Sequence, residues 1–362
     1  MSGESIGARK AAHLDICTDA QLYDVEGSST MLDELRFVHR SLPEVRSSDV
    51  STATRVLDFD VSMPVFISCM TGGSDSGYRA NRDLAEVAER ARIPIGTGSI
   101  RVLFRHPEVT EHFALKKIAP SVPVIANIGG VQLRHSPPEP LIELLKRLEV
   151  DAVAVHLNPG QELVQPEGDR DYDGVLDGVR RLCDASPVPV IAKETGFGIA
   201  PDEARALVDA GVAYVDVAGA GGTNWVTVER YRLDESQAQT AAEFADWGTP
   251  TALLLDAIGG LDGRVLASGG LRTGMDVAKC IALGAQSAGL ALPFARAVVA
   301  GGVDAGLELA ERLRAVLTTV MILTGSRSVA DLRGAPLLRS REFAWMRDEL
   351  RWATGARSEG RA

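Results

Sequence analysis

The residues whose types and spacing best suit chemistry lie in the stretch HLNPGQELVQPEGDRDY, which covers positions 156–172. It presents an imidazole at His156, amides at Asn158 and Gln161, and a carboxylate at Glu162. A carboxylate beside neutral amide acceptors suits a hard cation such as Mg²⁺, which takes few protein ligands and leaves positions for substrate phosphates. The stretch therefore predicts a metal-assisted diphosphate site. The simpler alternative is a polar loop that caps the end of a strand.

A buried strand should position these groups. Residues 152–155 are small or β-branched and are bounded by a segment rich in polar residues, glycine and proline, which is typical of a strand. If the alternation continues, His156 and Asn158 point to the same side, and the other two side chains follow across a turn at Pro159-Gly160. Four functional groups then crowd the end of one strand, where α/β folds place their chemistry.

A second set of suitable residues lies near the N-terminus. On a helix, Arg9 and His13 would share a face, with Lys10 alongside. A solvated basic tail is the simpler interpretation of this set in isolation. An anionic ligand in the main site would favour the other interpretation, because an arm that carries arginine and lysine can close over a diphosphate through charge-assisted hydrogen bonds.

The elements that must carry these residues follow a repeating order of strand and helix. Eight strand-like runs occur, most of them separated by helical or loop segments of the length expected of β/α units, and polar or glycine-rich residues follow most of the runs. This pattern predicts an α/β fold of the TIM (β/α)8 barrel class with its active face at the carboxyl ends of the strands. A doubly wound sheet is the competitor, but no G-x-G-x-x-G follows the first strand. The strand-like runs are residues 65–69, 94–97, 124–126, 152–155, 189–192, 214–217, 264–267 and 287–291.

Three parts of the chain follow from this order. We expect an N-terminal arm that closes over the active site at 1–62, the barrel at 63–304, and a helical segment at 305–362 that packs on the barrel or serves in assembly. Helices are expected near 81–91, 201–211 and 273–284, and from Thr249-Pro250 onward. The segment that ends at Trp247 is expected to be an elaborated loop.

Glycines near the last two strands indicate a phosphate site. Backbone N–H groups at this place in such barrels commonly hold a phosphate, and glycine lets the backbone approach it closely. The runs SGGLR at 268–272 and GLAL at 289–292 lie there, and GGT at 221–223 could add a contact, although tight turns would also explain the glycines. Lys193, after the fifth strand, could stabilise the negative charge of a reduced flavin. Together these residues suggest FMN.

Composition limits the class of protein. The net charge of −11 argues against nucleic acid as the main partner. The four cysteines show no C-x-x-C or zinc-like spacing, which favours a reducing compartment. The N-terminal residues lack an apolar signal region and no run is long enough to span a membrane, so we expect a soluble, cytoplasmic protein.

With these residues in view, the chain resembles the type 2 isopentenyl-diphosphate Δ-isomerases, the FMN-dependent family. The resemblance runs from Arg9 to about Leu332. HxNxxQE followed by PEGDR is its most specific part, whereas MTGG and ASGG are shared more widely among flavin barrels. The other matching motifs are RKAAH, FVHRSLPE, GTGSIR, ANIGG, KETGFG, AGGTNWVTVE and ASGGLRTGMDVAKCIALGA.

The resemblance implies a set of site residues. Glu162 would bind Mg²⁺, and Gln161, His156 and Asn158 would lie at the reacting centre. The diphosphate would be held by residues of the N-terminal arm and of the second strand's end, together with Gln161: Arg9, Lys10, His13, Gly98, Ser99, Ile100 and Arg101. FMN would be held by Cys69, Met70, Thr71, Ser99, Asn127, Lys193, Thr223, Gly269, Gly270, Leu271, Ala291 and Leu292.

The resemblance also implies the reaction and its partners. Isopentenyl and dimethylallyl diphosphate would interconvert by proton addition and abstraction, with Mg²⁺ and reduced FMN, and NADPH would serve only to reduce the flavin. A homotetramer or homo-octamer would be the expected assembly. The hypothesis for proton transfer is that flavin N5 does the chemistry while Gln161 orients it or relays a proton.

Two alternatives stay open at this point. The first is another FMN-dependent barrel oxidoreductase. An α-hydroxy-acid oxidase needs a His-Gly-x-Arg setting, yet none of the six histidines precedes a glycine, and Cys69 at a strand end is a poor thioimidate nucleophile. The second is a binding protein for flavin or a polyprenyl phosphate, against which the expected metal ligand Glu162 argues.

Overall fold

A closed barrel of parallel strands forms the centre of the computed structural model, which describes residues 6–70 and 72–355. Within these residues eight strands follow one another around the barrel in chain order, and the last pairs with the first through Ala288 and Val65. The prediction of a TIM barrel is confirmed. The strands are β4 (Val65–Ile67), β5 (Ile95–Ser99), β6 (Val124–Gly129), β7 (Ala152–Leu157), β8 (Val190–Glu194), β9 (Tyr214–Asp216), β10 (Val265–Ala267) and β11 (Ser287–Leu290).

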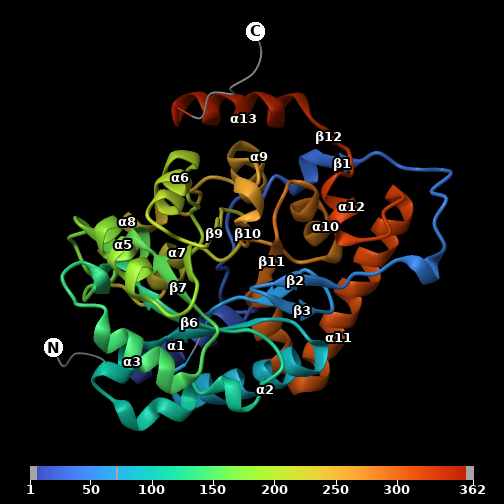
Figure 1. Ribbon diagram of the computed structural model, residues 1–362. Helices are drawn as coiled ribbons and strands as arrows, with labels where there is room; N and C mark the ends of the chain where they lie inside the picture. Colours follow the sequence, from blue (N-terminus) through green and yellow to red (C-terminus); the bar gives the residue numbers. More distant parts are fainter. Residues whose placement is uncertain (1–5, 71, 356–362) are drawn as a thin grey trace.

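Helices surround the barrel on its outside (Figure 1). Their buried faces and the outward faces of the strands share one large apolar core, which includes Leu84, Leu145 and Leu317. Short 3-10 turns, η3 (Ile100–Phe104), η4 (Pro107–His112) and η5 (Leu115–Lys117), follow β5 in place of a long helix. The outer helices are α2 (Asp75–Ala91), α3 (Glu139–Leu148), α5 (Val175–Ala185), α6 (Pro201–Asp209), α9 (Thr251–Ile258), α10 (Gly274–Ala282) and α11 (Leu292–Thr324).

The amino end of the barrel is closed by a hairpin. Strands β2 (Thr54–Val56) and β3 (Phe59–Val61) pair in antiparallel register, and their apolar residues join inward-facing strand residues such as Ile125 and Ile191 in a second, smaller core. This part of the N-terminal segment therefore lies at the end of the barrel opposite the strand ends where a site was expected.

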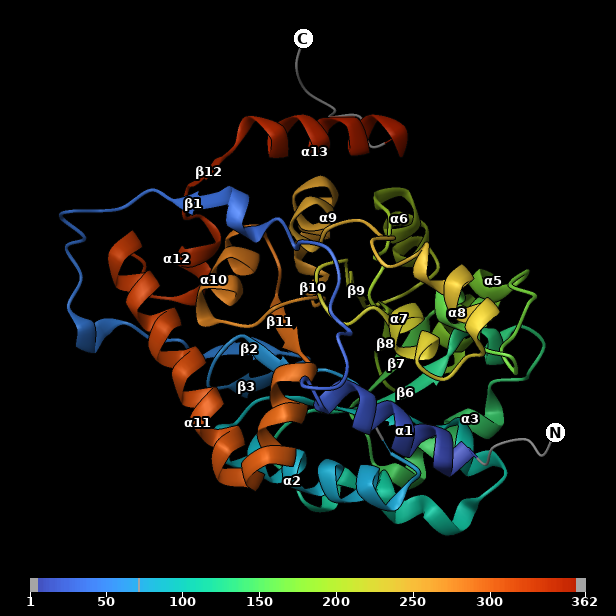
Figure 2. The same cartoon turned by 180° about the vertical axis from the view of Figure 1, so that it is seen from behind.

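The other end of the same segment lies by the strand ends. Helix α1 (Ile6–Thr18) carries the three basic residues singled out above and lies beside α2, α7 (Trp225–Arg230) and α11 (Figure 2). Ile16 and Val25 pack with Val228 and Leu292 in a small apolar cluster, which fixes α1 and the chain after it against the barrel.

The segment that ends at Trp247 differs from the expected loop. It contains α7 and a second helix, α8 (Glu235–Ala242). Both begin at capping side chains, because Asn224 accepts hydrogen bonds from the backbone N–H groups of Val226 and Thr227, and Asp234 accepts one from that of Gln237. The caps satisfy backbone groups that an irregular loop would leave to water.

The C-terminal segment also differs in part. Helix α11 begins at Leu292 and breaks at Gly301 and Gly302, and α12 (Val329–Arg333) and α13 (Arg341–Ala353) follow it. Between these two helices, β12 (Leu337–Arg339) pairs with β1 (Leu35–Phe37), so the C-terminal segment is not purely helical. In Figures 1 and 2, α13 lies at the far side of the molecule from α1.

Candidate active site

The carboxyl ends of the barrel strands surround a cavity of about 1010 Å³. This volume is large for a single small ligand and leaves room for a cofactor together with a substrate. Most of the residues singled out in the sequence line it: Arg9, Lys10, His13, Cys69, Met70, Ser99, Arg101, Asn127, His156, Asn158, Gln161, Glu162, Lys193, Thr223, Gly269, Gly270, Leu271, Ala291 and Leu292.

Two singled-out residues are placed differently, and a third is not described. Gly98 and Ile100 flank Ser99 on the chain but do not line the cavity. The Ile100 side chain is fully buried in the apolar core, so only backbone atoms of these two residues could serve a ligand. Thr71 lies outside the described residues.

His156 lies at the end of β7 and is held by a neighbouring strand. Its Nδ1 is 2.5 Å from Oδ1 of Asn127 on β6, so Nδ1 carries the proton that the amide oxygen accepts. Burial, with smaller contributions from the cations of Lys193, Lys10 and Arg101, lowers the pKa of His156 to about 4. At neutral pH the imidazole is therefore uncharged.

The residues after β7 form a short helix instead of a turn. In α4 (Pro159–Val164) proline occupies the first position, where it needs no backbone N–H, so the expected turn at Pro159-Gly160 is wrong. The helix brings Gln161 and Glu162 beside Asn158, whose Nδ2 donates to Gln161 Oε1 at 3.0 Å and to Glu162 Oε1 at 3.4 Å. The strand end and the helix together orient both side chains.

A buried carboxylate that the sequence analysis missed organises this cluster. Glu229, on α7, is fully buried and accepts hydrogen bonds from Gln161 Nε2 at 2.9 Å and from Gln165 Nε2. His13 and Arg232 lie on the same carboxylate at 2.8 Å and 2.5 Å. Burial raises its pKa, but these hydrogen bonds and charges outweigh burial and lower the pKa of Glu229 to about 2. The carboxylate is thus a fixed negative charge.

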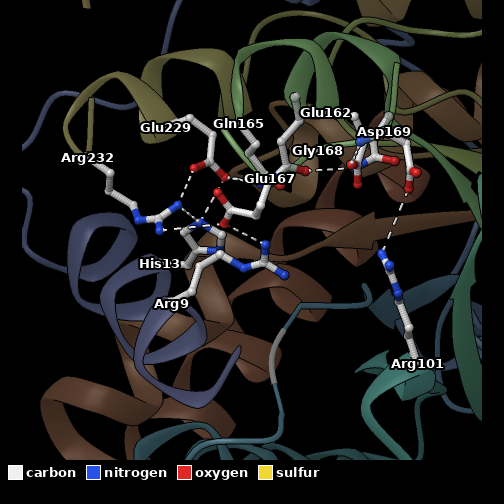
Figure 3. Close-up of polar contacts among 12 residues, drawn as sticks. Arg9, His13, Arg101, Glu162, Gln165, Glu167, Gly168, Asp169, Glu229 and Arg232 are labelled. Atoms are coloured by element: carbon white, nitrogen blue, oxygen red, sulfur yellow. Dashed lines mark hydrogen bonds and ion pairs between the residues drawn. The ribbon is translucent and has the colours of Figure 1, made fainter. Parts of the chain in front are cut away.

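The basic residues of α1 line the cavity, and Arg9 and His13 point toward acidic side chains there (Figure 3). Arg9 Nη1 pairs with Glu167 Oε1 at 2.8 Å, and His13 takes part in the Glu229 cluster. Lys10 Nζ donates to the backbone oxygen of Ser99 at 3.0 Å. Burial and the neighbouring Arg9 lower the pKa of Lys10 to about 8.

Further polar side chains line the opposite strand ends. Lys193 Nζ lies 3.6 Å from Oδ2 of Asp216, and Ser268 donates to Oδ1 of the same aspartate at 2.6 Å. Ser68, also in the cavity wall, has a buried hydroxyl without a hydrogen-bond partner among the described residues. An unpaired buried hydroxyl at this place fits a ligand with polar ring atoms.

Glycines of two loops pack against each other next to this wall. Gly221, Gly269 and Gly270 have φ values of 113°, 93° and 80°, a backbone conformation that side chains rarely adopt. A Cβ on Gly270 would lie 2.2 Å from the carbonyl oxygen of Gly221, so the two loops can approach only without side chains. Helix α11 begins at Leu292, which lines the same cavity as Gly269 and Gly270. Close-packed glycine backbone near a helix N-terminus is suited to binding an anion such as the phosphate of FMN.

Curated relatives match this chain over nearly its whole length. Proteins named isopentenyl-diphosphate delta-isomerase are 42% identical over 325 residues in Borrelia garinii subsp. bavariensis, covering 90% of this chain and 91% of that protein. The protein of that name in Methanothrix thermoacetophila is 42% identical over 343 residues, covering 92% and 94%. The chain belongs to the isopentenyl-diphosphate delta-isomerase family. The resemblance inferred from the motifs is thereby confirmed.

The flavin relationship has separate support. The family model for FMN-dependent dehydrogenases matches residues 157–339. Solved structures share the fold at low identity: a flavocytochrome b2 variant with sulfite bound has a TM-score of 0.67 at 20% identity, covering 98% of this chain and 85% of that one. A mandelate oxidase variant with benzaldehyde has a TM-score of 0.64 at 20% identity, covering 91% and 95%. This isomerase-family chain therefore shares its barrel with FMN-dependent enzymes.

The residues present also fit a divalent cation. Glu162 lines the cavity, and its Oε2 accepts a hydrogen bond from the backbone N–H of Asp169 at 2.9 Å. Within residues 6–70 and 72–355, no group of three or more histidine, cysteine or acidic side chains is arranged to hold a metal. A site with one carboxylate suits Mg²⁺, which leaves its other positions to water and phosphate oxygens. In the same described part of the chain, no helix is both long and apolar enough to cross a membrane.

Proposed function

We propose that this protein interconverts isopentenyl diphosphate and dimethylallyl diphosphate. The observation that carries the proposal is the identity of 42% to proteins named for this reaction, over nine tenths of the chain. The cavity supports it, because three cations from α1 and η3 line it together with the Glu162 carboxylate. The close-packed glycine backbone at Gly269-Gly270 lines the same cavity.

The chain's own residues would divide the work as follows. Arg9, Lys10 and Arg101 would bind the diphosphate, and Glu162 would hold Mg²⁺ against it. His156, which is neutral, would present its unprotonated Nε2 without adding charge. The backbone at Gly269-Gly270 and Leu292 would hold the FMN phosphate, with Thr223, Ala291 and Leu271 beside it. When bound in reduced form, FMN would supply an electron-rich ring and a proton-exchanging N5.

Gln161 would orient the reacting groups. Its amide oxygen accepts from Asn158 and its amide nitrogen donates to Glu229, so both ends of the side chain are fixed. Replacement of Gln161 by Ala would remove one of the two glutamine hydrogen bonds to Glu229 and should lower kcat at least about 100-fold, the lower range for a positioned proton-transfer partner. Turnover close to that of the wild type would exclude this role.

The direct test is an anaerobic mixture of the purified protein with FMN, NADPH, Mg²⁺ and isopentenyl diphosphate, followed by NMR. Dimethylallyl diphosphate should form only with reduced flavin and should cease to form with EDTA. No product, with steady consumption of NADPH in air, would instead identify a flavin oxidoreductase. Cys69 does not support an oxidoreductase that uses a cysteine nucleophile, because burial raises the pKa of its thiol and disfavours the thiolate.

Several finer expectations belong to the same proposal. NADPH as reductant, Mg²⁺ as the metal, a homotetramer or homo-octamer as the assembly and a cytoplasmic location rest on the motif resemblance and the composition. We also propose that α1 acts as an arm over the active site, since Arg9, Lys10 and His13 all line the cavity. Light scattering of the purified protein and metal titration of the apoenzyme would test the assembly and the cation.

A further inference from the structure

Two arginines at the diphosphate end of the cavity are already paired with carboxylates of one loop. Arg9 Nη1 lies 2.8 Å from Oε1 of Glu167, and Arg101 Nη1 lies 4.0 Å from Oδ2 of Asp169 (Figure 3). All four side chains line the cavity. The arginines come from α1 and η3, which are far apart in the sequence, whereas both carboxylates come from the few residues after α4.

These two pairs differ from the buried cluster beside them in their exposure to water. The side chains of Glu167 and Asp169 are 48% and 43% exposed, whereas that of Glu229 is 0% exposed. A half-exposed carboxylate that loses its cation is stabilised by water, but a buried one would be left uncompensated. Arg9 and Arg101 can therefore leave their partners at small cost, while His13 and Arg232 stay on Glu229. Arg232 Nη2 also lies 4.0 Å from Oε1 of Glu167, so this carboxylate keeps a second cation when Arg9 leaves.

The backbone of the loop is fixed although its acidic side chains face water. Arg170 donates to the carbonyl oxygens of Gln165 at 2.6 Å and Gly168 at 3.0 Å. Tyr172 donates to the carbonyl of Asp169 at 2.7 Å, and the N–H of Asp169 donates to Glu162. The two carboxylates thus remain at set positions next to the proposed metal ligand whether or not they hold an arginine.

We propose that Glu167 and Asp169 are exchangeable counter-ions of the diphosphate site. They hold Arg9 and Arg101 at the cavity wall, and they release both guanidinium groups when the diphosphate binds. They are positioning residues, because they act through the arginines. The proposal rests on the proposed function, since it takes a diphosphate as the ligand.

The exchange has a measurable consequence. Each carboxylate competes with a phosphate for the same arginine and repels the incoming anion. Glu167→Gln and Asp169→Asn keep an oxygen that can accept from the arginine but remove the charge. Binding of inorganic pyrophosphate should therefore become tighter in each variant, by about three- to tenfold at low salt. A purely structural role predicts the opposite, namely weaker binding and a lower melting temperature.

The experiment is titration calorimetry of the FMN-loaded protein with inorganic pyrophosphate and MgCl2. Glu111→Gln and Asp177→Asn serve as matched controls, because they remove the same charge from exposed pairs with Lys117 and Arg180 outside the cavity. The controls should bind pyrophosphate like the wild type. Should Glu167→Gln lower the melting temperature, Asp169→Asn supplies the same test, since its pair at 4.0 Å has no direct hydrogen bond.

The outcomes separate this proposal from the proposed function. Unchanged or weaker pyrophosphate binding in the well-folded variants overturns the exchange, and isomerase turnover by the wild type then leaves the proposed function standing. Tighter binding in the variants of a protein that performs no isomerisation would support the exchange and overturn the reaction. A wild-type protein that binds no pyrophosphate would overturn the exchange together with the diphosphate site.

Discussion

His156 shows how single residues in this site are tuned by their surroundings. Burial lowers its pKa from 6.5 to about 4, so protonation favours the unfolded chain. Above pH 6.5 the imidazole is neutral in both the folded and the unfolded chain, so His156 does not lower the free energy of unfolding there. The free energy of unfolding falls as the pH drops from 6.5 toward 4. Because one pKa unit corresponds to about 1.4 kcal/mol, the loss attributable to this residue is about 3 kcal/mol.

The prediction at this scale concerns His156→Gln. Urea unfolding at a series of pH values between 4 and 7.5 should show a smaller loss of the free energy of unfolding for the variant than for the wild type. The buried Glu229 contributes little in this window, since its stability is lost only as the pH falls from 4.5 toward 2. Equal slopes for the two proteins would mean that His156 is not buried in its neutral form.

At the scale of elements, α1 delivers a lysine whose charge depends on pH. Because the pKa of Lys10 is about 8, its ammonium loses a proton as the pH rises through 8. We expect kcat/KM to fall above about pH 8 and to stay level to higher pH in Lys10→Arg, since arginine keeps its charge. Steady-state rates from pH 7 to 9.5 test this, with Lys146→Arg on the exposed surface of α3 as control. A profile unchanged by Lys10→Arg would contradict it.

The loop after α4 carries a second prediction at this scale. A Cβ on Gly168 would lie 2.0 Å from the carbonyl oxygen of Glu162, so Gly168→Ala must push the loop away from the helix. The N–H of Asp169 would then lose its contact with the Glu162 carboxylate. We expect the concentration of Mg²⁺ that gives half-maximal activity to rise at least about tenfold. Gly334→Ala, where the nearest atom would be 3.5 Å away, should leave it unchanged.

At the scale of the whole molecule, two segments far apart in the sequence, residues 35–37 and 337–339, meet away from the active site. Strand β1 pairs with β12, and Arg339 donates to both oxygens of the buried Asp256 at 2.8 and 2.7 Å. Arg347 on α13 reaches the same carboxylate at 3.3 Å. This contact ties the C-terminal segment to α9 on the outside of the barrel.

Arg339→Ala should therefore lower the free energy of unfolding by about 1–2 kcal/mol, the range for a bidentate pair that keeps one other partner. The value of kcat/KM should not change, because neither residue lines the cavity. Urea unfolding and steady-state kinetics of the same preparation check both statements. The exposed Arg55, paired at 3.7 Å with Asp60, provides a control substitution of small effect.

The sequence predicts the eight strands well because each is a short, mostly apolar run and most are followed by polar or glycine residues. The Glu229 cluster could not be found in this way, since its partners His13, Gln161 and Gln165 come from segments that only the fold brings together. The one available signal was that an acidic residue, Glu229, directly follows the mostly apolar run from Trp225 to Val228. The start of α4 could have been predicted, because asparagine followed by proline is a common way to begin a helix.

The closure of β11 on β4 has a consequence for the order of events during synthesis. The proposed FMN phosphate site needs Gly269-Gly270 together with the first turn of α11, and α11 follows the last barrel strand. A nascent chain that ends before Leu292 therefore lacks part of the cofactor site, however much of the barrel it contains. Flavin would be acquired only after the start of α11 has left the ribosome, so bound FMN would report that all eight barrel strands have been synthesised.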